Sequence, residues 1–404
     1  MTGWVRRSRL NQVGVAALAA VVAACVLAPA AASAGSRYAL ARTLRWVAFS
    51  SPRDGVGLFQ AERYPLSGNG SVHCVLYTRA STDGGVSFGV AGQTLAHTDC
   101  QTGAAYEAIV FAGAHTLLAY GSRLAISHND GASWEPVRLA GAVVDLAASG
   151  HEVWALITRC RAYAPRCAVS LIRSVDDGQR WRAADPQPPA DTVPGLDVRV
   201  AQTGDDQLLA LAPGGGLVLA WPALRAHSSV IYPTTVAVQS LAAGAANWVS
   251  TSVACTAAPF QTELAIAPDG ARLLACASEP SAGEQLKALA VSPGAGAAWR
   301  IASRACVDFG SCRGGMPSSG YLGGLYALSA RTIFYTGDRS SLAGTFDGGR
   351  RWRVWPQIGG DAAGSLQVSF INARDGWALA QGVQAPGTSS LWRTSDGGER
   401  WRRA

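Results

Sequence analysis

Short apolar runs separated by polar turns recur along the chain, and each pair of runs predicts a strand, a turn and a second strand. Val47–Phe59 has this pattern, and Val368–Ala380 repeats it. Five further copies occupy Ile109–Tyr120, Leu146–Ile157, Val200–Ala212, Leu264–Ala277 and Leu325–Gly337. The runs are rich in Val, Leu, Ile and Ala, which is typical of strands buried on both faces. Their spacing of roughly 53 residues fits four short strands plus loops, the size of one propeller blade.

A turn motif of the form Ser/Thr-x-Asp-x-Gly-x-x-Trp follows most of these hairpins. Five copies are Ser81–Phe88, Ser127–Trp134, Ser174–Trp181, Thr345–Trp352 and Thr394–Trp401. A degraded sixth copy, Ser292–Trp299, keeps the frame but lacks the acid. The fourth repeat has no recognisable copy, only the apolar run Leu217–Trp221.

The residue types of this motif predict a β-turn that is fastened by its own side chains. A short acid accepts hydrogen bonds from backbone N–H groups of the turn that follows it. The glycine supplies a positive φ that other residues resist, and the aromatic residue lies back over the hairpin and buries apolar area. We therefore expect structural roles for Asp83, Phe88, Asn129, Trp134, Asp176, Trp181, Trp299, Asp347, Trp352, Asp396 and Trp401.

Six motifs and seven hairpins predict an all-β fold, a single β-propeller of seven four-stranded blades, with six and eight blades as alternatives. The sequence stops at Ala404, three residues after the last motif aromatic, so the last blade is expected to lack its outermost strand. Residues 37–48 precede the first hairpin, and we expect them to complete that blade and remove an exposed sheet edge. No linker rich in Pro, Ser or Gly divides residues 35–404, so we interpret them as one domain.

Residues 1–34 have the pattern of an export signal. A basic head precedes the apolar stretch Val13–Ala34, which ends in a small-x-small peptidase pattern at Ala32 to Ala34. The alternatives are a lipoprotein anchor on Cys25 and an uncleaved membrane helix. All three place the remaining chain outside the cytoplasmic membrane, because the arginines stay inside. We expect an extracytoplasmic protein, either secreted or anchored.

Eight cysteines follow the signal, and an even number in an exported chain indicates disulfides. Sequence neighbours suggest the pairs Cys74–Cys100, Cys160–Cys167, Cys255–Cys276 and Cys306–Cys312, although many other connectivities exist. There is no Cys-x-x-Cys, and the histidines are scattered singly, so no metal site is expected. No cofactor-binding motif occurs either, and no cofactor is predicted.

The net charge of +7 is the difference between 34 basic and 27 acidic residues, and Lys287 is the single lysine. No run of five or more basic residues occurs, so a nucleic-acid partner is not expected. Six arginines of the last two repeats are interpreted as solvating outer blade edges and discouraging edge pairing. They are Arg350, Arg351, Arg353, Arg400, Arg402 and Arg403.

The motifs resemble the BNR/Asp-box repeat propellers of the sialidase superfamily. Asp375–Ala380, followed by Trp392–Trp401, resembles the photosystem II assembly and stability factor type within that superfamily. The resemblance covers roughly residues 45–404. It implies a seven-bladed propeller outside the cytoplasmic membrane that acts as an assembly or protein-binding factor, without being evidence of photosynthesis.

Glycoside hydrolases occur in the same superfamily, so catalysis is an alternative. Resemblance to a sialidase would require an Arg-Ile-Pro element, an arginine triad and a Tyr/Glu pair, and no Arg-Ile-Pro occurs. Tyr106 and Glu107 are adjacent, and neighbouring strand residues point to opposite faces, which makes them a poor catalytic pair. No serine-hydrolase elbow or phosphate loop is found. We therefore expect no catalytic residue.

Loops on a rigid propeller are the expected contact surfaces. The loop around the expected Cys306–Cys312 pair is the first candidate, because arginine and aromatic residues are enriched at interface hot spots. Its residues are Arg304, Asp308, Phe309 and Arg313. The sequence favours a monomeric binding or assembly protein at the cell envelope, with a protein or a glycan as partner. A carbohydrate-binding propeller and a sialidase-like hydrolase are the alternatives.

Overall fold

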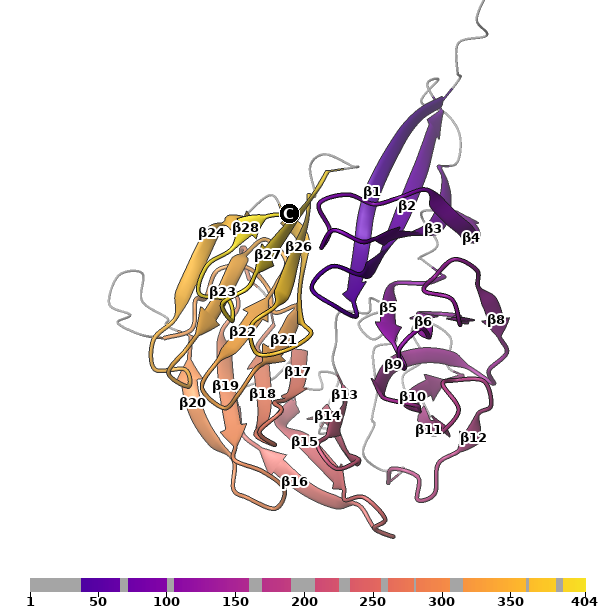
Figure 1. Cartoon of the computed structure of the whole chain (residues 1–404). Coiled ribbons are helices and arrows are strands. Elements are labelled where there is room, and N and C mark those ends of the chain that lie inside the picture. The colour runs from indigo at the N-terminus through magenta and orange to yellow at the C-terminus, as the bar shows by residue number, and fades with distance from the viewer. Residues whose placement is uncertain are drawn as a thin grey trace, which may run out of the picture.

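Seven four-stranded antiparallel sheets, arranged as the blades of a ring, make up the computed structural model (Figure 1). The structure describes residues 38–65, 72–99, 105–159, 169–189, 208–224, 233–255, 261–279, 281–305, 315–360, 363–382 and 388–404. No helix occurs within these ranges. The predicted all-β fold, a propeller of seven blades, is confirmed.

Each blade is a meander of four strands that are consecutive in sequence. Blades one to four contain β1 (Tyr38–Phe49), β2 (Gly55–Pro65), β3 (His73–Ser81), β4 (Ala91–Asp99); β5 (Ala108–Phe111), β6 (Leu117–Tyr120), β7 (Leu124–Ser127), β8 (Glu135–Val137); β9 (Ala142–Ser149), β10 (Glu152–Thr158), β11 (Val169–Ser174), β12 (Arg182–Ala183); β13 (Leu209–Ala212), β14 (Gly216–Leu224), β15 (Pro233–Leu241) and β16 (Val249–Val253). Blades five to seven contain β17 (Gln261–Ile266), β18 (Arg272–Ala277), β19 (Lys287–Ser292), β20 (Arg300–Arg304); β21 (Gly324–Ala327), β22 (Ile333–Thr336), β23 (Ser341–Thr345), β24 (Arg353–Gly359); β25 (Ala363–Phe370), β26 (Gly376–Gly382), β27 (Ser389–Thr394) and β28 (Arg402–Arg403).

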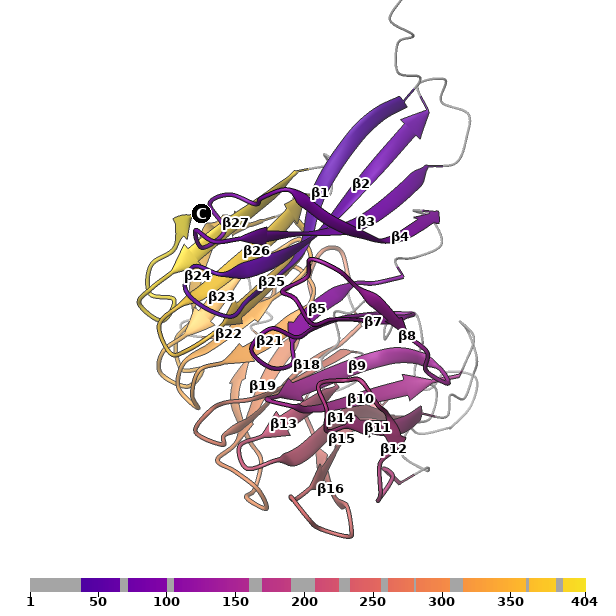
Figure 2. The same cartoon turned by 45° about the vertical axis from the view of Figure 1, so that its right-hand side comes forward.

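The meanders give the ring two different faces. One face carries the turns between the first and second strands and between the third and fourth strands. We call it the box face, because all six motif copies lie in the turn between the third and fourth strands. The opposite face carries the turns between the second and third strands and the crossings between blades. β1 and β2 are the longest pair, and they extend beyond the ring on the opposite face (Figure 2).

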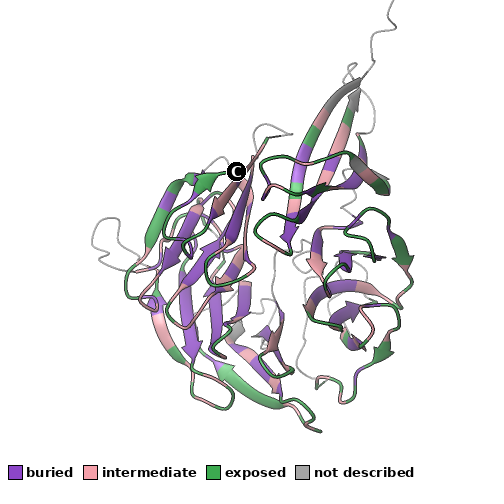
Figure 3. Ribbon diagram, in the orientation of Figure 1, coloured by how far each residue is buried: buried purple, intermediate pink, exposed green. Residues whose placement is uncertain are grey.

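The core lies between the blades. Seven clusters of buried apolar side chains occur, one at each blade junction, while the fourth strands are largely exposed (Figure 3). Motif aromatics reach across these junctions to the preceding blade. Trp134 of blade two donates from Nε1 to Thr78 Oγ1 of blade one at 3.0 Å, and Trp352 of blade six donates to Ser303 Oγ of blade five at 3.0 Å. The motif therefore joins blades as well as forming a turn.

The ring closes without a shared strand, so the expectation that residues 37–48 complete the last blade is wrong. Residues 38–49 form β1, which pairs with β2 along its whole length. The last blade has its own fourth strand, β28, whose two residues pair with β27. The sequence argument failed because a fourth strand needs only the few residues that follow the motif aromatic.

Side chains hold the junction between blades seven and one. Phe49 of β1 stacks on Trp377 of β26, with ring centroids 3.8 Å apart and planes within 4°. Trp377 Nε1 donates to the carbonyl oxygen of Gly84 in the motif turn of blade one at 2.9 Å. Gln367 of β25 donates from Nε2 to the Val47 carbonyl oxygen at 3.1 Å. Aromatic stacking and buried hydrogen bonds thus replace strand pairing as the fastening.

Blade four departs from the predicted repeat. Its first hairpin consists of β13 and β14, so the predicted hairpin at Val200–Ala212 is misplaced toward the N-terminus, and residues 190–207 lie outside the described ranges. Leu217–Trp221 belongs to the second strand of the blade. The turn of this hairpin is 213–215, so the predicted segment stops where the first strand ends.

Candidate functional site

The five complete motifs share one hydrogen-bond pattern. In blade seven, the Thr394 hydroxyl donates to Asp396 Oδ1 at 2.9 Å and accepts from the Gly398 N–H at 3.0 Å. Asp396 Oδ1 also accepts from the Arg400 N–H at 2.9 Å, and Gly398 has a φ of 89°. The motifs of blades one, two, three and six repeat these three contacts at 2.8–3.0 Å. The acid is thus bonded within its own turn.

These contacts keep the motif acids ionised. The hydroxyl and the N–H of Ser87 lower the pKa of Asp83 to about 2. The N–H of Arg180 lowers the pKa of Asp176. Burial raises the pKa of Asp396, but hydrogen bonds from its turn outweigh it and the net shift is downward. A carboxylate held in this state is unsuited to donate a proton at neutral pH.

Two motif positions lack both the acid and an amide in its place. In blade five, Ser292 Oγ lies 3.0 Å from the carbonyl oxygens of Gly294 and Ala297. In blade four, the turn is 242–248, a copy that the sequence search missed because only its aromatic remains. Trp248 Nε1 donates to the Pro186 carbonyl oxygen of blade three at 3.2 Å, so the junction contact persists. A search for the aromatic alone, at the repeat spacing, would have found it.

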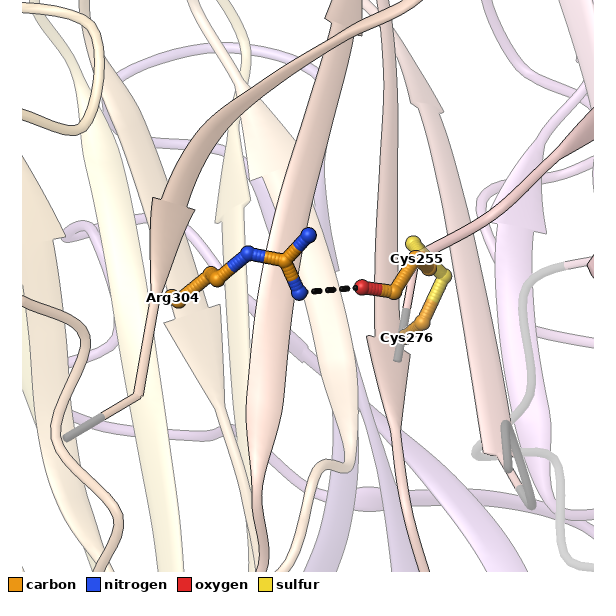
Figure 4. Close-up of a disulfide and its surroundings, with 3 residues drawn as sticks. All are labelled: Cys255, Cys276 and Arg304. Carbon is orange, nitrogen blue, oxygen red and sulfur yellow. Dashed lines mark hydrogen bonds between the residues drawn. A yellow bond between two sulfur atoms is a disulfide. The ribbon is translucent and has the colours of Figure 1, made fainter. Parts of the chain in front are cut away.

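A disulfide joins blade four to blade five. Cys255 follows β16, Cys276 lies in β18, and both side chains are buried. Arg304 Nη1 donates to the Cys255 carbonyl oxygen at 2.9 Å (Figure 4). Cys74 is disulfide-bonded as well. The remaining cysteines of the expected pairs lie outside the described residues: Cys100, Cys160, Cys167, Cys306 and Cys312.

The predicted contact loop is only partly described. Arg304 ends β20 and is exposed, and its guanidinium group is held by the contact with Cys255. Asp308, Phe309 and Arg313 lie outside the described residues, so their grouping stays a prediction.

Tyr106 and Glu107 precede β5 at the opposite face. Tyr106 is buried in the cluster between blades one and two. Burial raises the pKa of Glu107 to about 8, although Arg45 opposes this shift. A nearby acid, Asp145, is buried and accepts from the N–H groups of Leu208 and Leu209, each at 2.7 Å, which connects blade three to blade four. A carboxyl group with a raised pKa is a frequent feature of functional sites, but its tyrosine neighbour here belongs to the core.

The motif turns and outer strands differ in charge around the ring. In blades one to four these segments (82–99, 128–141, 175–189, 242–255) hold three arginines and seven acids. In blades five to seven (293–305, 346–360, 395–404) they hold eight arginines and three acids. We call the eight arginines the basic rim: Arg300, Arg304, Arg350, Arg351, Arg353, Arg400, Arg402 and Arg403, all of them exposed. Counting charge repeat by repeat would have revealed this sector.

Several basic side chains of blades two and three contact acids, as His115 does with Asp130 at 3.0 Å in blade two. Arg173 contacts Glu152 at 2.7 Å, and His151 contacts Asp177 at 2.8 Å. Among the described residues, no ion pair within 4.0 Å involves an arginine of the basic rim. The guanidinium group of Arg353 instead lies over the Trp355 ring, 5.1 Å from its centroid. The basic rim therefore keeps most of its capacity to bind carboxylates.

Within the described ranges, no group of three or more His, Cys, Asp or Glu side chains could hold a metal ion. The same ranges contain no helix that is long and apolar enough to cross a membrane.

No protein-family model and no curated protein matches the chain. A solved structure described as YCF48 bound to D1 peptide matches with a TM-score of 0.53 and 15% identity, covering 89% of this chain and 97% of that one. A polysaccharide lyase, the ulvan lyase bound to -[GlcA(1-4)Rha3S]-, matches with a TM-score of 0.51 and 10% identity, covering 84% and 90%. At these identities the likeness concerns the fold alone.

Proposed function

We propose that this chain is a non-catalytic protein-binding module of the cell envelope, and that the basic rim binds an acidic segment of its partner. The charge asymmetry carries the proposal, since eight exposed arginines occupy one sector of the ring. Guanidinium groups bind carboxylates through parallel hydrogen bonds, and unpaired positive charge steers an acidic partner to that sector. The rigid blades hold these side chains at fixed spacings, which lowers the entropic cost of binding.

Other observations support a protein partner and no catalysis. The likeness to YCF48 bound to D1 peptide makes a protein segment the first class of ligand to test. The motif acids are bonded within their own turns, and Tyr106 is buried, which argues against these residues as a hydrolase site.

Two matched double variants test the basic rim. Arg351→Glu/Arg353→Glu changes blade six, and Arg180→Glu/Arg182→Glu changes the equivalent motif positions of blade three. The probe is a fluorescein-labelled poly-glutamate peptide, titrated by anisotropy at low and at physiological salt. We expect the blade-six variant to weaken binding about tenfold or more and the blade-three variant to change it less than about twofold, because charge pairs outside the contact contribute little. Equal effects of the two variants, or no binding by the wild type at low salt, would reject the proposal.

An anionic polysaccharide is the second candidate ligand. Uronate and sulfate groups can bind the same guanidinium groups, and the second structural neighbour is described with a glucuronate-containing ligand. The same variants are therefore titrated against polygalacturonate. Binding of polygalacturonate, without binding of poly-glutamate, would replace the acidic protein segment with a glycan.

Export is part of the proposal. The basic head and apolar stretch of residues 1–34 support it, as does a disulfide between buried cysteines. Cell fractionation of the full chain and of a chain without residues 2–34 tests it. Recovery of the full chain from the cytoplasm would reject an envelope role.

A further inference from the structure

The single lysine of the chain is one of its most deeply buried side chains. Lys287 begins β19 at the opposite face and is 1% exposed. Its Nζ lies 2.8 Å from the carbonyl oxygen of Gly320, 2.9 Å from that of Ser318 and 3.2 Å from that of Ser319. The carbonyl oxygens of Gln285 and Pro317 lie at 3.4 Å. Five backbone carbonyl groups therefore converge on one ammonium group.

These carbonyls belong mostly to the crossing between blades five and six, which folds around the ammonium group. The Gln285 N–H donates to the Ser318 carbonyl oxygen at 3.0 Å, and Gln285 Oε1 accepts from the Leu322 N–H at 2.6 Å. The Tyr335 hydroxyl donates to the Pro317 carbonyl oxygen at 3.1 Å. The crossing is thus held from two strands and one turn, with the ammonium group at its centre.

We propose that the five carbonyls form a cation site that the chain fills with its own ammonium group, so that Lys287 is a positioning residue for the crossing 316–322. An ammonium group is compact and offers three donors that can turn toward converging acceptors, whereas the five donors of a guanidinium group lie in one plane. Every other basic residue of this arginine-rich chain is arginine, and the exception stands where a planar group does not suit the acceptors. Carbonyl rings that replace the hydration shell of an alkali cation work on the same principle.

The charge of this group has few other partners. Burial lowers the pKa of Lys287 to about 7, and Glu284 opposes the shift. The Tyr335 ring centroid lies 5.8 Å from Nζ, at the outer limit of a cation–π contact. Buried carbonyl groups that lose their only charged donor carry a desolvation cost, so we expect the crossing to loosen when the ammonium group is removed.

The end of β20 lies beside the cation site and is bonded to its main chain. The Lys287 carbonyl oxygen accepts from the Ala305 N–H at 2.6 Å, and the Arg304 carbonyl oxygen accepts from the Met316 N–H at 3.1 Å. These main-chain hydrogen bonds connect the end of β20 to the crossing 316–322, whose carbonyls surround the ammonium group. This inference holds whether or not the basic rim binds an acidic partner.

Truncation with chemical rescue tests the proposal. Lys287→Ala removes the ammonium group and leaves the carbonyls, and hydrogen exchange of residues 316–322 is followed at pH 6 in ammonium chloride or tetramethylammonium chloride of equal ionic strength. The control is Arg272→Ala, which removes a buried cation from the box-face end of the same sheet, where Nη1 donates to Ser240 Oγ at 2.6 Å.

We expect exchange in 316–322 to rise about tenfold or more in Lys287→Ala, and ammonium, but not tetramethylammonium, to restore much of the protection, because only ammonium has N–H donors. Arg272→Ala should show no such selectivity. Unchanged exchange in Lys287→Ala, or equal responses to the two salts, would overturn the cation site. If Lys287→Ala does not fold, the same hydrogen-exchange measurement is made on Lys287→Met and Lys287→Arg. Wild-type protection of 316–322 in either variant would also overturn the proposed cation site.

Discussion

The two faces of the ring use ionisable side chains in contrasting ways. On the box face the motif acids are half-buried or exposed, lie within eight-residue turns, and have lowered pKa values, as for Asp83 and Asp396. On the opposite face the notable ionisable groups are buried and occur once each. Burial raises the pKa of Asp145 to about 7 and that of Asp338 to about 6, and it lowers that of Lys287.

The stabilising contacts of the box face repeat from blade to blade, whereas those of the opposite face each occur once. A motif turn finds its partners within four residues, so any blade can carry a copy and the copies add up. Asp145 finds two of its partners 63 and 64 residues away, and Lys287 reaches Gly320, 33 residues away. The box face can therefore tolerate the loss of one motif acid, as in blades four and five. No second copy exists to replace the contacts of Asp145 or Lys287 on the opposite face.

Removing a buried motif aromatic should have the largest effect on the box face. Trp134 is 6% exposed and fills the junction between blades one and two, so Trp134→Ala should lower the free energy of unfolding by about 3–5 kcal/mol. Trp299→Ala is the matched control, because Trp299 occupies the same motif position but is only partly buried. Urea unfolding measures both. A loss at Trp299 as large as that at Trp134 would contradict the junction role.

Removing the disulfide between blades four and five should have the next largest effect. The pair closes a loop with a sequence separation of 21, and Cys255→Ala/Cys276→Ala should cost about 3 kcal/mol, mainly by freeing the unfolded chain. The free energy of unfolding is again read from urea titration. Hydrogen exchange at the motif turn of blade two is the internal control, and local opening there should be unchanged. An unaltered free energy would show that the junction is held by packing alone.

Asp145→Asn tests the opposite face and should lower the free energy of unfolding by about 1–3 kcal/mol. The reason is that an amide cannot accept all three N–H bonds of this carboxyl group. The folded wild type keeps the Asp145 proton up to about pH 7, while an aspartate with its ordinary pKa releases it near pH 3.8. Unfolding therefore releases a proton between these values, and this group makes the free energy of unfolding fall as pH rises from 4 to 7. The slope should become shallower in Asp145→Asn but not vanish, because the pKa values of Glu107 and Asp338 are raised as well. An unchanged slope would assign it to those groups alone.

Replacing a single motif acid should have the smallest effect. Blade two already uses Asn129, whose Oδ1 accepts from the Ser133 N–H at 2.9 Å. Asp396→Asn should therefore change the free energy of unfolding by less than about 0.5 kcal/mol, and Asp396→Ala should lower it by about 1 kcal/mol. The pH dependence has the opposite direction to that of Asp145. Motif acids such as Asp83 stabilise the fold above pH 4, and this contribution is lost as pH falls toward 2. Equal losses in the Asn and Ala variants would contradict the acceptor role.

The sequence predicted what is local and repeated. The motif turns, the seven blades and six of the seven inner hairpins follow from residues that lie close together in sequence. Ring closure was predicted wrongly, because two residues after Trp401 suffice for a fourth strand. The role of Lys287 could not be predicted, since its acceptors are backbone atoms that carry no side-chain signature. The basic rim is present in the sequence, but from the sequence alone six of its arginines are interpreted as solvating blade edges, Arg304 is placed in the contact loop, and Arg300 is given no role.

Ring closure by side chains makes every blade a contiguous stretch of the gene. No strand is borrowed across the ends of the chain, so a blade can finish its sheet as soon as its four strands have been synthesised. An in-frame duplication or deletion of one repeat would add or remove a whole sheet without breaking another. The junction at which Phe49 stacks on Trp377 is where such a lineage must match its first blade to its last.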